Sequence, residues 1–148
     1  MATVNPYITF NGDCERAFNL YKSIFGGEFT QLERYKDVPK SMSDKFTMCE
    51  GEKILHVALP ISNETILMGS DTCHETDSEF DSDVHFGDNV SLSINTQSEE
   101  EATRIFEGLA KDGRVNMPLQ KTFWNAYYGM LIDKYGVNWM ISYNYPKQ

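Results

Sequence analysis

The 148-residue sequence has few cysteines and no local concentration of positive charge. Cys14, Cys49 and Cys73 are widely spaced and form no C-x-x-C pair. Such an odd, sparse set is typical of reduced thiols in a cytosol rather than of a disulfide framework. The 22 acidic residues outnumber the 13 basic ones, which gives a net charge of −9. Because neutralising phosphates requires clustered cations, this balance argues against nucleic acids and anionic membranes as partners.

The sequence also lacks long apolar runs and several catalytic motifs. No run approaches the roughly 20 residues that span a bilayer. The first ten residues have neither the basic flank nor the apolar core of a signal peptide, so we expect a cytoplasmic protein. Neither a Ser-His-Asp order nor a G-x-S-x-G elbow is present, which leaves acyl transfer without support. The 41% hydrophobic and 13% aromatic content is typical of one globular domain with a real core.

The first half of the chain is expected to contain one helix and several strands. Between Ala17 and Phe25, apolar residues recur at i, i+3, i+4, i+7 and i+8, the stripe of an amphipathic helix. Gly26 and Gly27 are the expected stop, since glycine accepts the left-handed conformation at a helix end. Strands are expected at residues 4–10, 28–35, 46–49, 54–60 and 65–69.

Residues 71–88 differ in composition from the rest of the chain. They are rich in aspartate and glutamate and contain almost no aliphatic residues, so we expect a mobile connector. Cys73, His74 and Glu75, with His85 further on, are residue types that can ligate metals. Because they lie among Asp, Ser and Thr, we interpret them as a solvated turn rather than as a metal site.

The pattern of the first half starts again after this connector. Ser98 and Glu101 are spaced as a capping box, in which the Ser98 side chain accepts from the backbone of residue 101 and Glu101 reaches back. An apolar stripe follows from Ala102, and Gly113 is the expected stop. Strands are expected at residues 90–95, 114–119, 126–133 and 137–143. The last two lie in residues 121–145, which hold both tryptophans and five of the eight tyrosines.

The two halves align with an offset of 85, which places Ala17 on Ala102 and Leu20 on Ile105. Together with the repeated β-α-β-β-β order, this indicates two copies of one module. We therefore predict an α+β fold, with helices outside a curved, mostly antiparallel sheet cup. The whole chain, residues 1–148, is expected to be one domain. Its parts are module one at about 3–70, the acidic loop at 71–88 and module two at about 89–145.

Four stretches give the chain a family resemblance. They are PYITFNGDCERAFNLYKSIFGGE, KILHVALPI, LMGSD and NMPLQKTFWNAYYGMLIDKYGVNWMIS. They resemble the vicinal-oxygen-chelate superfamily of glyoxalase, bleomycin-resistance and extradiol-dioxygenase proteins, and within it the PhnB-like proteins. Relatives are sometimes labelled as demethylubiquinone methyltransferases, although no glycine-rich loop for S-adenosylmethionine is present. The resemblance implies a small-molecule cavity between facing sheets, and a homodimer.

Superfamily enzymes typically bind a divalent metal through His or Glu on the first and last strands of each module. Here one face of the first strand offers Tyr7 and Thr9, and the last strand offers Trp139, Ile141 and Tyr143. A Zn, Ni or Fe site normally needs three or four His, Cys or carboxylate ligands. We therefore predict no metal residues and no cofactor, with a divalent metal as the alternative.

His56 is the candidate catalytic residue. By strand alternation it faces the same side as Ile54 and Ala58, where it could act as an acid, a base or a hydrogen-bond donor near neutral pH. The alternative is a buried histidine satisfied within the core. Glu33, Arg34 and Tyr35 could add polar contacts at a rim, although such charges are usually only solvated.

Aromatic residues supply the remaining candidates. Large aromatic side chains most often belong to a core or an interface, but a pocket with aromatic walls and a few polar groups is typical of small-molecule sites. Trp124 precedes a strand, where a loop residue could close over a ligand. The predicted ligand-binding residues are Tyr7, His56, Trp124, Tyr128 and Trp139.

Three functions fit these observations. The first is a non-catalytic protein that binds a small, partly aromatic or amphipathic molecule. The second is a metal-dependent lyase, isomerase or dioxygenase that acts on a small oxygenated substrate and uses His56. The third is an interaction module that works through a dimer surface.

Overall fold

The computed structural model describes residues 1–39, 49–73 and 83–147. The chain divides into two compact units, Met1–His85 and Phe86–Gln148, called here the first and second unit. The boundary between them lies inside the acidic segment 71–88.

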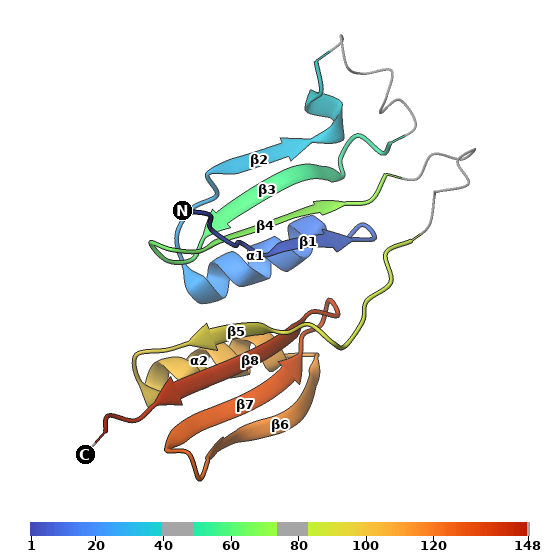
Figure 1. Cartoon of the computed structure of the whole chain (residues 1–148). Helices are drawn as coiled ribbons and strands as arrows, with labels where there is room; N and C mark the ends of the chain where they lie inside the picture. Colours follow the sequence, from blue (N-terminus) through green and yellow to red (C-terminus); the bar gives the residue numbers. More distant parts are fainter. Residues whose placement is uncertain (40–48, 74–82, 148) are drawn as a thin grey trace. The chain divides into compact units, whose positions relative to one another are not determined.

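The first unit is a four-stranded sheet with one α-helix along one side of it (Figure 1). The sheet order is β1-β4-β3-β2, in which β1 runs parallel to β4 and the other neighbours are antiparallel. The elements are β1 (Tyr7–Phe10), α1 (Cys14–Phe25), β2 (Gln31–Arg34), the 3-10 turn η1 (Tyr35–Asp37), β3 (Ile54–Pro60) and β4 (Ile66–Asp71).

The second unit repeats this arrangement. Its sheet order is β5-β8-β7-β6, again with the first and last strands parallel and the others antiparallel. The elements are β5 (Leu92–Asn95), α2 (Glu99–Ala110), β6 (Arg114–Lys121), β7 (Ala126–Ile132) and β8 (Asn138–Asn144). The predicted α+β class and the repeated β-α-β-β-β module are therefore confirmed.

Each helix buries most of the apolar stripe that the sequence pattern predicts. In α1 the buried residues include Ala17, Tyr21 and Ile24, and in α2 they are Ala102, Ile105, Phe106 and Leu109. Ser98 caps α2 as expected by accepting from the Glu101 backbone at 3.1 Å. The reciprocal bond differs by one residue, because the Glu101 carboxylate accepts from the backbone of Gln97. No helix among the described residues is long and apolar enough to cross a membrane.

Asp71 corrects the expectation that residues 71–88 form a mobile connector from their first residue. It ends β4 with 2% of its surface exposed. Its carboxylate accepts hydrogen bonds from the backbone N–H groups of Gly12 and Cys14, both at 3.0 Å, and of Ile54 at 2.9 Å. Asp71 therefore joins the β1–α1 turn to the start of β3.

The other end of the acidic segment is also attached to folded parts of the chain. The side chain of Asn11 exchanges two hydrogen bonds with the backbone of Val84. In the second unit, Asn138 donates to the carbonyl of Gly87 at 2.8 Å. The interpretation of His74 and Glu75 as a solvated turn concerns residues outside the described ranges, as does most of the strand expected at 46–49.

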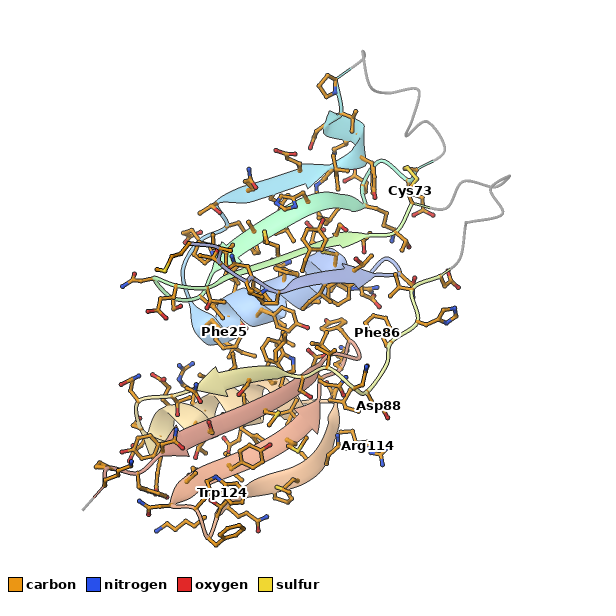
Figure 2. All side chains as sticks on the ribbon, in the orientation of Figure 1. Phe25, Cys73, Phe86, Asp88, Arg114 and Trp124 are labelled. Atoms are coloured by element: carbon orange, nitrogen blue, oxygen red, sulfur yellow. A yellow bond between two sulfur atoms is a disulfide. The ribbon has the colours of Figure 1, made fainter. Side chains whose placement is uncertain are left out.

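A disulfide corrects the expectation of three reduced thiols. Cys49 and Cys73 are bonded, with their Cα atoms 5.0 Å apart (Figure 2). Closing a loop with a sequence separation of 24 residues contributes roughly 3 kcal/mol to stability in the chain-entropy view. Cys14 is a free, buried thiol whose pKa is raised by burial first and by Asp71 second. The argument from reduced thiols to a cytosol therefore loses its basis.

Candidate functional site

Glycine positions show which face of the first sheet is covered by α1. A Cβ atom on Gly69 would lie 2.7 Å from the Phe18 ring of α1, so Gly69 faces the helix. Val57 pairs with Gly69 and shares that face. Because side chains alternate along a strand, His56 and Ala58 point to the opposite side. We call this side the helix-free face.

The helix-free face of the first unit brings two predicted site residues together. The rings of Tyr7 and His56 are stacked, with centroids 5.8 Å apart and an interplanar angle of 26°. Tyr7 is 49% exposed, and His56 lies opposite Glu33 in the β2–β3 register. Thr9 and Ser70 lie opposite each other on the same face. This face therefore combines the stacked Tyr7–His56 pair with a carboxylate and two hydroxyl groups.

The three residues expected at a rim separate into two roles. Glu33 lies on the helix-free face through its pairing with His56. Arg34 instead forms an ion pair with Glu15 and donates to the carbonyl of Glu52 at 2.8 Å. Tyr35 donates to the carbonyl of Asp71 at 2.7 Å, and burial, followed by the charge of Asp71, raises its pKa. Arg34 and Tyr35 thus make contacts that hold the fold together.

The second unit has a helix-free face of the same kind. A Cβ atom on Gly129 would lie 2.7 Å from the Phe106 ring of α2, so Gly129 faces the helix. By alternation Tyr128 and Met130 point to the other side. Met140 and Met117 are each paired with Met130, which gives this face three adaptable thioether side chains.

Trp124 lies at the turn between β6 and β7, beside this face (Figure 2). Its ring contacts that of Tyr128, with centroids 5.9 Å apart at 68°, and that of Phe123 at 4.9 Å. Trp124 is 53% exposed. The structure therefore brings Trp124 and Tyr128 together, as it does Tyr7 and His56.

Trp139 is placed apart from the other four predicted residues. It pairs with Leu131 on the α2 side of the sheet and is 1% exposed. Its indole N–H donates to the Asp133 carboxylate at 2.8 Å, and that carboxylate also accepts from the backbones of Tyr135 and Val137. This network holds the turn between β7 and β8, which is closed by a backbone bond of 3.0 Å from Gly136 to Asp133. Trp139 is a core residue in this structure.

The described residues do not fit the metal site that the superfamily implies. His56 and Glu33 supply two ligand types on the helix-free face of the first unit, and the neighbouring Thr9 and Ser70 offer only hydroxyl groups. A transition-metal site needs three or four His, Cys or carboxylate ligands. No group of three or more His, Cys, Asp or Glu able to hold a metal occurs in the described ranges.

Sequence reasoning missed a cavity of about 630 Å³ beside the β6–β7 turn of the second unit. It is lined by Lys121, Asn125, Tyr145, Pro146 and Lys147. These residues come from a strand end, a turn and the segment after β8, and they show no common motif. The pairing of Ala126 with Asn144 brings the three segments together, and pairing register cannot be derived from composition.

Comparison with known proteins gives the family. A sequence model of the family described as 3-demethylubiquinone-9 3-methyltransferase matches residues 2–142. Protein YjdN of Escherichia coli is 30% identical over 145 residues, which cover 94% of this chain and 93% of that protein.

Solved structures agree with the sequence comparison. Protein PA1353 from Pseudomonas aeruginosa is 33% identical with a TM-score of 0.79, and the match covers 97% of this chain and 98% of that one. A putative 3-demethylubiquinone-9 3-methyltransferase, PhnB protein, from Bacillus cereus is 26% identical with a TM-score of 0.75, over 96% and 99% of the chains.

A more distant structure relates the fold to the wider superfamily. A glyoxalase/bleomycin resistance protein/dioxygenase family enzyme from Burkholderia phytofirmans has a TM-score of 0.56 at 13% identity, over 97% of each chain. At this identity the likeness concerns the fold alone.

Proposed function

Because the chain belongs to the family described as 3-demethylubiquinone-9 3-methyltransferase, a PhnB-like family with the glyoxalase/bleomycin-resistance fold, we propose that it binds a small molecule without the usual metal site. The observation that supports this proposal is an aromatic contact on or beside the helix-free face of each unit. Tyr7 stacks on His56 in the first unit, and Trp124 contacts Tyr128 in the second. In both pairs an aromatic ring lies beside polar or thioether side chains, the combination found in small-molecule sites.

The chemistry of these faces defines the expected ligand. In the first unit, the stacked rings of Tyr7 and His56 favour a flat apolar body, while Glu33, Thr9 and Ser70 favour polar substituents on it. In the second unit, the Trp124 ring and the thioethers favour a flat or flexible apolar body. A small amphipathic molecule with an aromatic or unsaturated part satisfies both conditions. His56 would serve as a hydrogen-bond partner for such a ligand.

The His56–Glu33 pairing favours a second candidate, an enzyme that acts on a small oxygenated substrate. An imidazole and a carboxylate on the same face of a sheet are side chains that general acid–base catalysis uses. The two candidates differ in one outcome, which is whether a bound molecule is converted.

From a panel of aromatic and amphipathic compounds, we expect a binder of the first helix-free face to lose affinity about tenfold or more in Tyr7→Ala, and a binder of the second face to do so in Trp124→Ala. Each change removes a large apolar contact. Isothermal titration calorimetry measures this loss. His85→Ala is the matched control for His56→Ala, because His85 is an exposed histidine outside the helix-free face. Equal affinity of all variants would contradict the proposed site.

The same panel tests the catalytic alternative. It should contain S-adenosylmethionine, because the family description names a methyltransferase. Product analysis after incubation should show the bound compound unchanged. Two results would favour an enzyme over a binding protein. One is conversion of the compound that is lost in His56→Ala. The other is a metal content near stoichiometric that is also lost in that variant.

We further propose that the protein is a homodimer, as the resemblance to the superfamily implies. Exposed apolar side chains such as Phe123, Trp124 and Val90 support association, since large exposed aromatics are enriched at interfaces. Static light scattering at micromolar concentration should give twice the chain mass of 17.0 kDa. A mass of one chain throughout would contradict the dimer.

A further inference from the structure

The cavity beside the β6–β7 turn is framed by backbone hydrogen bonds. The N–H of Tyr145 donates to the carbonyl of Asn125 at 3.1 Å, and the N–H of Thr122 donates to that of Ala126 at 2.8 Å. The Thr122 hydroxyl also exchanges hydrogen bonds with the backbone of Ala126. The turn and the segment after β8 are thus fixed to each other, and residues of both line the cavity of about 630 Å³.

Two ammonium groups line this cavity without an acidic neighbour in its wall. Neither Lys121 nor Lys147 forms a salt bridge within the described ranges, and none of the five lining residues is acidic. The Nζ atom of Lys121 lies 5.5 Å from the centre of the Tyr145 ring. This cation–π contact orients Lys121 while leaving its N–H donors available.

Tyr145 contributes a neutral wall to the cavity. Its hydroxyl donates to the Glu99 carboxylate, so this carboxylate is already engaged. Desolvation first and this hydrogen bond second raise the pKa of Tyr145 to about 12, so the phenol stays uncharged well above neutral pH.

Asn125 adds a neutral donor. Its backbone has a φ of 65°, and its N–H and carbonyl are bonded to Thr122 and Tyr145. Its side-chain amide has no hydrogen bond among the described residues, so the NH₂ group can point to a ligand. Two ammonium groups and one amide, all donors, are the groups that recognise carboxylate or phosphate oxygens.

We propose that the cavity lined by Lys121, Asn125, Tyr145 and Lys147 binds the carboxylate or phosphate group of a small organic anion. The site is distinct from the helix-free faces and does not depend on the ligand proposed for them. The cavity volume lies within the usual range for small-molecule sites, roughly 300–1,000 Å³.

The charge of the chain selects small anions over polymeric ones. With 22 acidic and 13 basic residues, the protein as a whole repels nucleic acids and anionic membranes. A small anion interacts mainly with charges within about one Debye length, roughly 10 Å at 0.1 M salt. Within that distance the two lysines attract its anionic group.

The test is titration of the full chain at low salt with phenyl phosphate, benzoate and inorganic phosphate. Binding is measured by the NMR shifts of backbone amides or by calorimetry. We expect at least one of them to bind at millimolar concentration or tighter, and to bind at least tenfold more weakly in the double variant Lys121→Gln/Lys147→Gln. Binding of phosphates alone or of benzoate alone identifies the preferred group. Binding by none of the three, up to about 20 mM, would overturn the proposal.

Two controls and one further test variant make the result specific. Lys134→Gln removes a lysine with a matching cation–π contact, 5.8 Å from the Tyr135 ring, and should leave anion affinity unchanged. Asn125→Gly removes the amide while keeping the positive φ that glycine accepts, and should weaken binding by about two- to fivefold. Trp124→Ala should not alter anion affinity, which separates this site from the proposed aromatic site. Equal losses in Lys134→Gln and in the double variant would show a general charge effect and overturn the assignment.

Discussion

Replacement of Asp71 by alanine is expected to lower the free energy of unfolding by roughly 4 kcal/mol. The carboxylate accepts from three backbone N–H groups, those of Gly12, Cys14 and Ile54. Asp71 is 2% exposed, so these donors would lie in a buried site with no acceptor to replace it. Urea unfolding followed by circular dichroism measures the loss, provided that the transition is two-state.

Asp88 is the matched control for this change. It is the last residue of the same acidic segment, is exposed and lies in a loop, so Asp88→Ala should change stability by less than about 0.5 kcal/mol. Asp71→Asn should give an intermediate loss, because an amide keeps one acceptor oxygen but cannot satisfy all three donors. Equal stability of Asp71→Ala and Asp88→Ala would show that the carboxylate does not hold the β1–α1 turn to β3.

Asp71 also shows what composition cannot reveal about the fold. In the sequence it belongs to a run of acidic residues, and composition predicts a solvated connector. In the structure it is the partner of Phe10 in the β1–β4 ladder, which places it at the buried end of the sheet. The difference arises from strand register, a long-range property that local composition does not determine.

The elements themselves could be predicted because each depends on a local period. The strand at Ile54–Pro60 has the expected bounds, and the helix ending at Phe25 stops at the expected glycines. The disulfide could not be predicted in the same way. Cys49 and Cys73 meet only because β3 and β4 run antiparallel between them, and a separation of 24 residues does not indicate this.

Part of the candidate site could be predicted from the sequence, because the alternation of side chains along a strand tells which residues share a face. Alternation correctly grouped His56 with Ala58 and opposite Val57 and Leu59. It cannot say which face of a strand the helix covers, because that choice depends on packing between elements. In the second unit Gly129 determines which face α2 covers, since only a residue without a side chain fits beneath Phe106. Trp139 lies on the side of that sheet that α2 covers, so it does not share a face with Tyr128, which Trp124 contacts.

Trp139→Ala is expected to lower the free energy of unfolding by about 4 kcal/mol, while Trp124→Ala lowers it by less than about 1 kcal/mol. Trp139 is 1% exposed and donates to Asp133, so its removal leaves a cavity and deprives a buried carboxylate of a donor. Trp124 is 53% exposed at a turn and leaves neither. Urea unfolding followed by circular dichroism compares the two variants, and titration with a ligand of the parent protein separates their roles. If Trp139→Ala kept its stability and lost ligand binding, Trp139 would belong to the site and the assignment of Trp139 to the core would be wrong.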